Sequence, residues 1–98
     1  MGKKAGSFST VAIFSMNSMK ALCSFGETGV AVTDREDVYE KLKVLRYTGT
    51  KSDPNKIITN EAVVVSLNHK IETVQAAMLL LMMKDLPARM ERRKQIST

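Results

Sequence analysis

The segment over about 70–85 constrains the fold more than any other part of this chain. Its apolar residues first recur at helical spacing, so that Val74, Met78 and Leu81 fall on one face. From Ala76 to Met83 every residue is apolar. A helix that is apolar on all sides is buried or lies between partners. We therefore predict a helix here that another surface must cover.

Pro87 is predicted to end this helix or to start a new one, because proline lacks the amide hydrogen that a helix interior uses. We expect a second, polar helix over about 87–97. Its basic residues are predicted to form a solvated face, with an anionic groove as the alternative. They are Arg89, Arg92, Arg93 and Lys94.

Two segments have the composition of strands. Residues 8–15 are rich in β-branched and aromatic side chains, and residues 29–33 contain a short apolar run. The three valines at 63–65 make a third strand candidate over about 62–66. So few strands leave open edges that would pair with another segment. The sequence thus predicts an α/β fold that is not a stable free monomer.

A further helix is predicted over about 34–46. Thr33 and Glu36 have the spacing of a capping box, in which two side chains satisfy amides at the helix start. Gly49 is a plausible stop, and residues 47–61 are predicted to be a loop. The apolar residues on one face of this helix are Val38, Leu42 and Leu45.

Bulk properties narrow the class of protein. The 98 residues suffice for one small domain. A net charge of +5 would suit an anionic partner, but with only two Tyr, three Phe and no Trp the chain lacks the aromatic interleaving of a nucleic-acid binder. The longest apolar run has eight residues, too few to cross a bilayer, and the start does not resemble a signal peptide. We expect a cytoplasmic protein with no membrane partner.

Metal chemistry is not predicted. The single cysteine excludes an internal disulfide and a cysteine zinc cluster. His69 is the only histidine and has no neighbouring ligand in the sequence.

Taken alone, two polar residues would be assigned a solvent-exposed or a turn position rather than a functional one. Lys20 follows the first predicted strand in a polar stretch, where a lysine is usually solvated. A functional lysine needs a lowered pKa from burial or neighbouring cations. Asn68 alone would be a turn residue before the helix over 70–85.

The order of several short motifs favours a functional role for these residues. The first motif is Gly-Lys-Lys-Ala-Gly-Ser-Phe at residues 2–8. The second, residues 11–20, runs from an apolar stretch through Ser15 to Lys20. The third, residues 26–33, is Gly-Glu-Thr-Gly followed by an apolar stretch that ends in Thr. Further on come Leu-Lys-Val-Leu-Arg at 42–46, Asn-His-Lys at 68–70 and Gln-Ala-Ala at 75–77. In order and spacing, over nearly all 98 residues, this series resembles the DegT/StrS family of sugar aminotransferases.

The resemblance implies a dimeric fold-type-I aminotransferase that uses pyridoxal phosphate. Its large-domain sheet would be only partly present in this chain. The family transfers an amino group, usually from glutamate, to a nucleotide-linked keto sugar. By motif position Lys20 is the lysine that binds the cofactor covalently and moves a proton. Ser15 matches a hydroxyl that binds the cofactor phosphate, and Asn68 matches an asparagine that reaches this phosphate from the neighbouring subunit.

Departures from the family pattern bear on substrate recognition more than on the cofactor. Lys70 stands where the family usually has Arg, so the planar fork of donors is lost while the charge is kept. Thr28 and Ser66 replace family glycines, and Tyr47 and Thr48 stand where Asn-His is common.

The family's chain is several times longer. Its amino-terminal part supplies amides for the phosphate, an aromatic ring that stacks on the cofactor and an aspartate that pairs with the ring nitrogen. We therefore expect residues 1–98 to be a single fragment of such a domain, inactive alone in transamination. The alternatives are a non-catalytic oligomerising or interaction module, a remnant, and a small basic nucleic-acid-binding protein.

Overall fold

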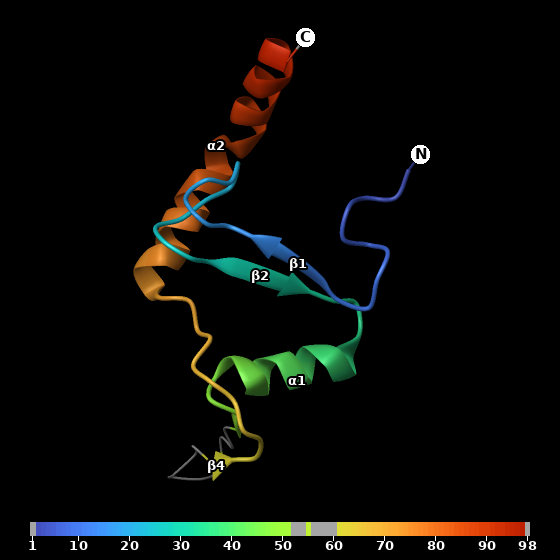
Figure 1. Ribbon diagram of the computed structural model, residues 1–98, viewed down its shortest axis with the longest axis vertical. Coiled ribbons are helices and arrows are strands. Elements are labelled where there is room, and N and C mark those ends of the chain that lie inside the picture. Colours follow the sequence, from blue (N-terminus) through green and yellow to red (C-terminus); the bar gives the residue numbers. More distant parts are fainter. Residues whose placement is uncertain (1, 52–54, 56–60, 98) are drawn as a thin grey trace. The chain divides into compact units, whose positions relative to one another are not determined.

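The computed structural model describes residues 2–51, 55 and 61–97. Contacts divide the chain into two compact units. Unit 1 comprises residues 1–12 and 32–70, and unit 2 comprises residues 13–31 and 71–98. The elements, in chain order, are β1 (Ala12–Ser15), β2 (Gly29–Val32), α1 (Glu36–Arg46), β3 (Thr50–Lys51), β4 (Glu61–Ala62) and α2 (Thr73–Ser97) (Figure 1).

Strands β1 and β2 form a two-stranded sheet and run in opposite directions (Figure 1). The strands approach closely, since a Cβ atom on Gly29 would lie 3.2 Å from the carbonyl oxygen of Phe14. The prediction of a strand over 29–33 is confirmed for Gly29–Val32. The strand predicted over 8–15 is wrong in its first half, because only Ala12–Ser15 is a strand.

Local side-chain hydrogen bonds explain the shorter β1. The Ser7 hydroxyl donates to the carbonyl of Lys4 at 2.8 Å, and the Ser9 hydroxyl donates to the carbonyl of Val11 at 2.7 Å. Serine side chains that bond nearby backbone groups favour turns over extended ladders. Residues 8–10 are accordingly a bend.

Helix α1 begins two residues later than predicted, and the predicted capping box is wrong. Arg35 is the N-cap and makes no side-chain cap hydrogen bond. The Thr33 hydroxyl instead donates to the carbonyl of Thr10 at 2.6 Å and accepts from the amide of Arg35 at 3.1 Å. The Arg35 Nε atom donates to Asp37 Oδ1 at 3.0 Å, and this hydrogen bond is the main reason that the pKa of Asp37 is lowered.

Gly49 organises the chain after α1. Its φ angle is +72°, in the left-handed region that favours glycine, and it follows the helix end at Arg46, as predicted for a stop. Its amide donates to the carbonyl of Val44 at 3.1 Å, and its carbonyl accepts from the amides of Val63 and Val64 at 2.9 and 3.3 Å. Gly49 therefore ties the end of α1, through its amide, to a segment that begins fourteen residues along the chain (49 to 63), through its carbonyl.

A strand pair replaces part of the predicted loop over 47–61. Strands β3 and β4 are antiparallel, with Thr50 opposite Ala62 and Lys51 opposite Glu61. The third strand candidate, 62–66, is wrong beyond Ala62, because two consecutive valine amides donate to the same Gly49 carbonyl and the ladder cannot continue. Pro54 and Asn60, which supported the loop prediction, lie outside the described residues.

Helix α2 is continuous from Thr73 to Ser97, so the prediction of two helices, 70–85 and 87–97, is wrong. Pro87 lies inside it and removes a backbone donor, a cost of about 3 kcal/mol in a helix interior. The Arg89 Nη2 atom donates to the carbonyl of Met82 at 3.1 Å across this position. A side-chain donor thus bonds a helix carbonyl beside the proline.

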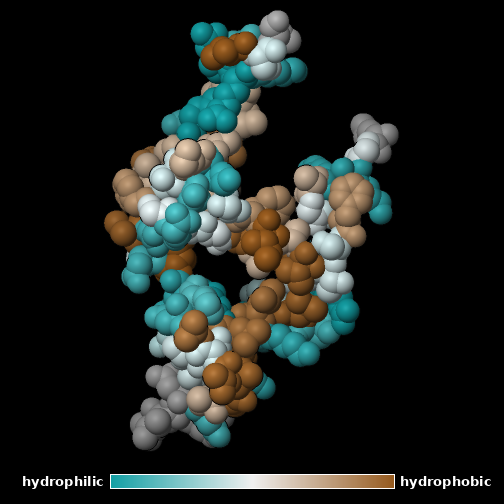
Figure 2. Space-filling view, viewed as in Figure 1, coloured by the Kyte–Doolittle hydropathy of each residue, from teal (hydrophilic) through white to brown (hydrophobic). Residues whose placement is uncertain are grey.

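Among the described residues, no apolar side chain is buried. The apolar run of α2 shows this most plainly, since Leu80 and Leu81 remain 66% and 57% exposed. Figure 2 shows hydrophobic side chains gathered in patches on the visible surface. Hydrogen bonds, rather than a packed core, therefore define the local structure of each unit.

Replacing Gly49 by Ala is expected to open the turn after α1. A Cβ atom there would lie 1.8 Å from the Val64 carbonyl oxygen, and the left-handed backbone alone costs about 1–2 kcal/mol with a side chain. We expect the Val63 amide to exchange with solvent at least about tenfold faster, since each 1.4 kcal/mol is a factor of ten. Gly2→Ala is the matched control, because nothing lies within 4 Å of its Cβ position. Unchanged Val63 exchange in Gly49→Ala would contradict this account.

Candidate functional site

The loop between β1 and β2 carries Lys20 and is closed at its base by the backbone. The Met16 amide donates to the carbonyl of Thr28 at 2.8 Å, one pair beyond the end of β1. The Met16 carbonyl accepts twice, from the Ser24 amide at 2.9 Å and from the Thr28 hydroxyl at 2.6 Å. The loop therefore folds back onto the end of the strand from which it leaves.

Asn17 shapes the turn before Lys20. Its side-chain oxygen accepts from the Met19 amide at 3.1 Å, and its carbonyl accepts from the Lys20 amide at 3.0 Å. This arrangement is an Asx turn, which asparagine forms readily. Lys20 is thus held by its backbone, while its side chain is exposed.

The amine of Lys20 and the hydroxyl of Ser15 are both uncommitted within the described part of the chain. No described residue bonds either group. Ser15 is the last residue of β1, and Lys20 lies in the following loop, so both belong to unit 2. Two free polar groups of the predicted types therefore occur in one unit, five residues apart.

Asn68 belongs to unit 1. Its backbone forms an isolated bridge with Tyr47, and its side-chain oxygen accepts from the Lys70 amide at 3.3 Å. The Lys70 amine lies 4.3 Å from the centre of the Tyr47 ring, a cation–π distance. Asn68 thus lies five residues before the start of α2 at Thr73 and bonds only residues of unit 1 among those described. Its predicted cofactor role stays a prediction.

Two residues of unit 2 escaped the sequence analysis as contributors to this loop. Ser24 is buried, and its hydroxyl donates to the carbonyl of Gln75 in α2 at 2.9 Å. The Gln75 side chain donates to the carbonyl of Phe25 at 2.7 Å. Gln75 stands three residues after Glu72, the spacing of a capping box, but glutamate is an unusual N-cap, so the signal was weak.

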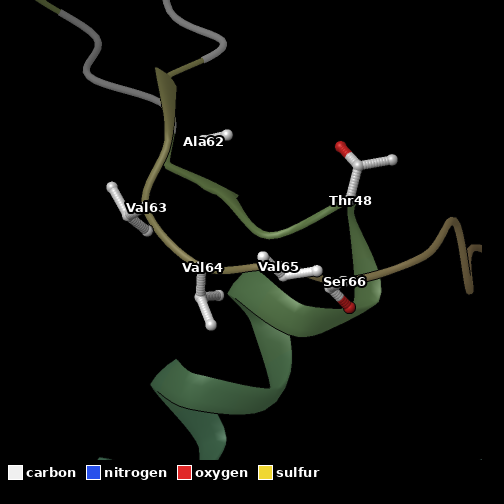
Figure 3. Close-up of a pocket in the computed structure, with 6 residues that line it drawn as sticks. All are labelled: Thr48, Ala62, Val63, Val64, Val65 and Ser66. Atoms are coloured by element: carbon white, nitrogen blue, oxygen red, sulfur yellow. The ribbon is translucent and has the colours of Figure 1, made fainter.

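A shallow hollow of about 360 Å³ lies in unit 1, where the chain passes the end of α1 and the turn at Thr48 (Figure 3). Valines 63–65 supply much of its wall, together with Ala62 and Ser66. None of its lining side chains is an acid, a base or an amine. The hollow therefore lacks the groups that a reaction would need, and it contains none of the predicted site residues.

The part of the chain that the structure describes contains neither a cluster of metal ligands nor a membrane-spanning helix. No three His, Cys, Asp or Glu residues gather there in a way that could hold a metal ion. Within the same residues, no helix has the length and apolar character needed to span a bilayer.

Comparison with known proteins decides the family. The profile of the DegT/DnrJ/EryC1/StrS aminotransferase family matches residues 1–98. This chain belongs to that family. The family expected from the motif order is thereby confirmed.

Its relatives include named sugar transaminases. The chain is 27% identical over 97 residues to a Campylobacter jejuni UDP-4-amino-4,6-dideoxy-N-acetyl-beta-L-altrosamine transaminase, covering 99% of this chain and 25% of the relative. It is 29% identical over 94 residues to the Helicobacter pylori protein of the same name, covering 95% of this chain and 24% of the relative. The chain thus spans about a quarter of the length of these relatives.

Solved structures confirm the fold class. A DegT DnrJ EryC1 StrS aminotransferase from Brucella abortus superposes with a TM-score of 0.78 at 26% identity, over 93% of this chain and 23% of that one. Helicobacter pylori PseC, an aminotransferase involved in the biosynthesis of pseudoaminic acid, gives 0.76 at 26% identity, over 87% and 22%. The chain therefore has the α/β fold of part of a fold-type-I aminotransferase.

Thr28, which stands where a family glycine is common, is expected to secure the loop through its hydroxyl. Thr28→Ala removes the 2.6 Å hydrogen bond to Met16, worth about 1 kcal/mol net. We expect roughly fivefold faster hydrogen exchange at the Ser24 amide, which shares the same acceptor. Thr28→Ser keeps the hydroxyl and should exchange at the original rate. Equal rates in the Ala and Ser variants would show that this hydroxyl does not hold the loop.

Proposed function

We propose that this chain supplies the cofactor lysine of a pyridoxal-phosphate transaminase that acts on a nucleotide-linked keto sugar. The observation that carries the proposal is the exposed, uncommitted amine of Lys20 in the loop just after β1, where the motif order predicts the cofactor lysine. The transaminase names of the relatives support the reaction type and the substrate class.

The groups present fit the proposed cofactor by chemical type. An aldehyde requires an amine that it can reach and that can give up its proton, and the Lys20 amine is exposed and pairs with no described residue. A phosphate requires donors, and the exposed Ser15 hydroxyl can donate one hydrogen bond. The Asn68 side-chain oxygen is engaged with the Lys70 amide, which leaves the amide nitrogen of its side chain to donate.

Each residue then has a distinct task. Lys20 would hold the cofactor covalently through Nζ and, once released, would hold and move a proton at that same atom. Ser15, at the end of β1, would hold a phosphate oxygen, and Asn68 would donate to the same phosphate from the second copy of the chain. The cofactor, when bound, supplies an electron sink, while the protein orients it and tunes its reactivity.

The complete reaction is proposed for an assembly larger than these residues. It comprises the rest of the family's chain and a second copy, acts in the cytoplasm and takes its amino group from a donor such as glutamate. The 98 residues alone are proposed to bind the cofactor weakly and not to turn over substrate.

The first test mixes the chain with pyridoxal phosphate and follows the visible band of the imine. We expect borohydride reduction followed by peptide mapping to place the adduct at residue 20, and Lys20→Ala to abolish this adduct. Lys20→Arg, which keeps the charge but cannot form the imine, should behave like Lys20→Ala. Lys84→Ala, which removes an exposed lysine from α2, should keep the adduct. An adduct spread evenly over the lysines and insensitive to Lys20→Ala would sink the proposal.

The exposed apolar run of α2 favours one alternative, a non-catalytic oligomerising module. Such a module would self-associate because Leu80, Leu81 and Met83 remain exposed in the described structure. Light scattering should then show a mass that rises with concentration, and Leu81→Lys should reduce it. A monomer over the whole concentration range would exclude this alternative.

A further inference from the structure

Two hydrogen bonds join the lysine-bearing loop to the start of α2 at Gln75, and a third fixes Gln75 within the helix start. The Ser24 hydroxyl donates to the Gln75 carbonyl at 2.9 Å, and Gln75 Nε2 donates to the Phe25 carbonyl at 2.7 Å. Gln75 Oε1 accepts from the Glu72 amide at 3.3 Å, which fixes the side chain at the helix start. We call the Ser24–Gln75 and Gln75–Phe25 bonds the clasp.

The clasp links segments about fifty residues apart in sequence, both of which belong to unit 2. It is reciprocal, because each segment donates once to a backbone carbonyl of the other. Ser24 is only 3% exposed and is the one buried polar residue among those described. A buried hydroxyl that lost its acceptor would be costly, so the loop and the helix are held in one register.

The loop is also anchored on its other side. The Ser24 amide donates to the Met16 carbonyl at 2.9 Å, so Ser24 bonds the end of β1 and the start of α2 at once. Lys20 lies between Asn17, whose turn fixes its backbone, and Ser24. The backbone of the segment that carries Lys20 is therefore anchored on both sides.

We propose that Ser24 and Gln75 are positioning residues that hold the Lys20 loop against the first turn of α2 and thereby aim its amine at the cofactor. The consequence for the amine rests on the proposed function, whereas the clasp itself does not. Neither residue touches the cofactor in this proposal. Both act through the backbone of residues 16–25.

Gln75 also caps α2, so a purely structural role has to be separated from positioning. Gln75→Glu does this, because the carboxylate keeps an acceptor for the Glu72 amide but loses the donor to Phe25. Ser24→Ala removes only a hydroxyl that takes no part in capping the helix. Ser24→Thr restores the hydroxyl and serves as the conservative rescue, and Ser97→Ala and Gln95→Ala are matched controls at the far end of α2.

Two readouts are taken on each variant whose circular dichroism retains the helix content. The first is hydrogen exchange at the Lys20 and Ser24 amides, which we expect to accelerate about fivefold in Ser24→Ala and Gln75→Glu. The second is the concentration of pyridoxal phosphate that half-saturates the imine band, which we expect to rise about fivefold in the same variants. Ser24→Thr and both control variants should match the original chain in both readouts.

The outcomes separate the clasp from the proposed function. Faster exchange together with weaker imine formation supports the positioning role. Unchanged exchange in both Ser24→Ala and Gln75→Glu overturns the clasp, and faster exchange with unchanged imine formation overturns its effect on Lys20. If the original chain forms no imine at residue 20, the proposed function fails and so does the aiming of the amine, while the exchange data still decide the clasp.

Discussion

The carbonyl oxygen of Met16 is the acceptor on which the lysine-bearing loop depends. It takes hydrogen bonds from the Ser24 amide and the Thr28 hydroxyl, and so fixes both sides of the loop at the end of β1. Unit 1 uses the same device independently, because the carbonyl of Gly49 accepts from the amides of Val63 and Val64. In each unit one doubly used acceptor converts a long connection into a defined turn.

This reliance on backbone acceptors follows from the absence of buried apolar side chains among the described residues. The hydrophobic effect is the dominant favourable term in folding, and here the apolar surface that would supply it stays exposed. The solved aminotransferases that match this chain are about four times longer, and this chain covers 23% and 22% of them. The local hydrogen bonds therefore specify the shape of each segment, whereas the energy of burial depends on surfaces that these residues do not provide for one another.

The sequence predicted elements well where a local pattern was sufficient. The short apolar stretch of β2 and the end of α1 at Arg46 were predicted correctly, and the motif order identified the family. Several of the failures came from contacts between residues far apart in the sequence, which local patterns do not encode. The Thr33 hydroxyl bonds Thr10 rather than capping α1, and β3 pairs with β4 across residues ten to twelve positions apart in the sequence. The same limit hid Ser24 and Gln75, whose contacts span fifty residues or more.

Pro87 divides α2 into stretches with unequal mechanical roles. Gln75 bonds the Lys20 loop from the first turn of α2. The backbone hydrogen bond that Pro87 cannot make lies far from this turn along the helix. Long helices kink most readily at proline. A force or a binding partner acting on the basic stretch that includes Arg92 and Arg93 would therefore be absorbed as bending at the proline. The first turn of α2 and the Lys20 loop lie on the other side of Pro87 from this stretch, so bending at the proline would leave the clasp unchanged.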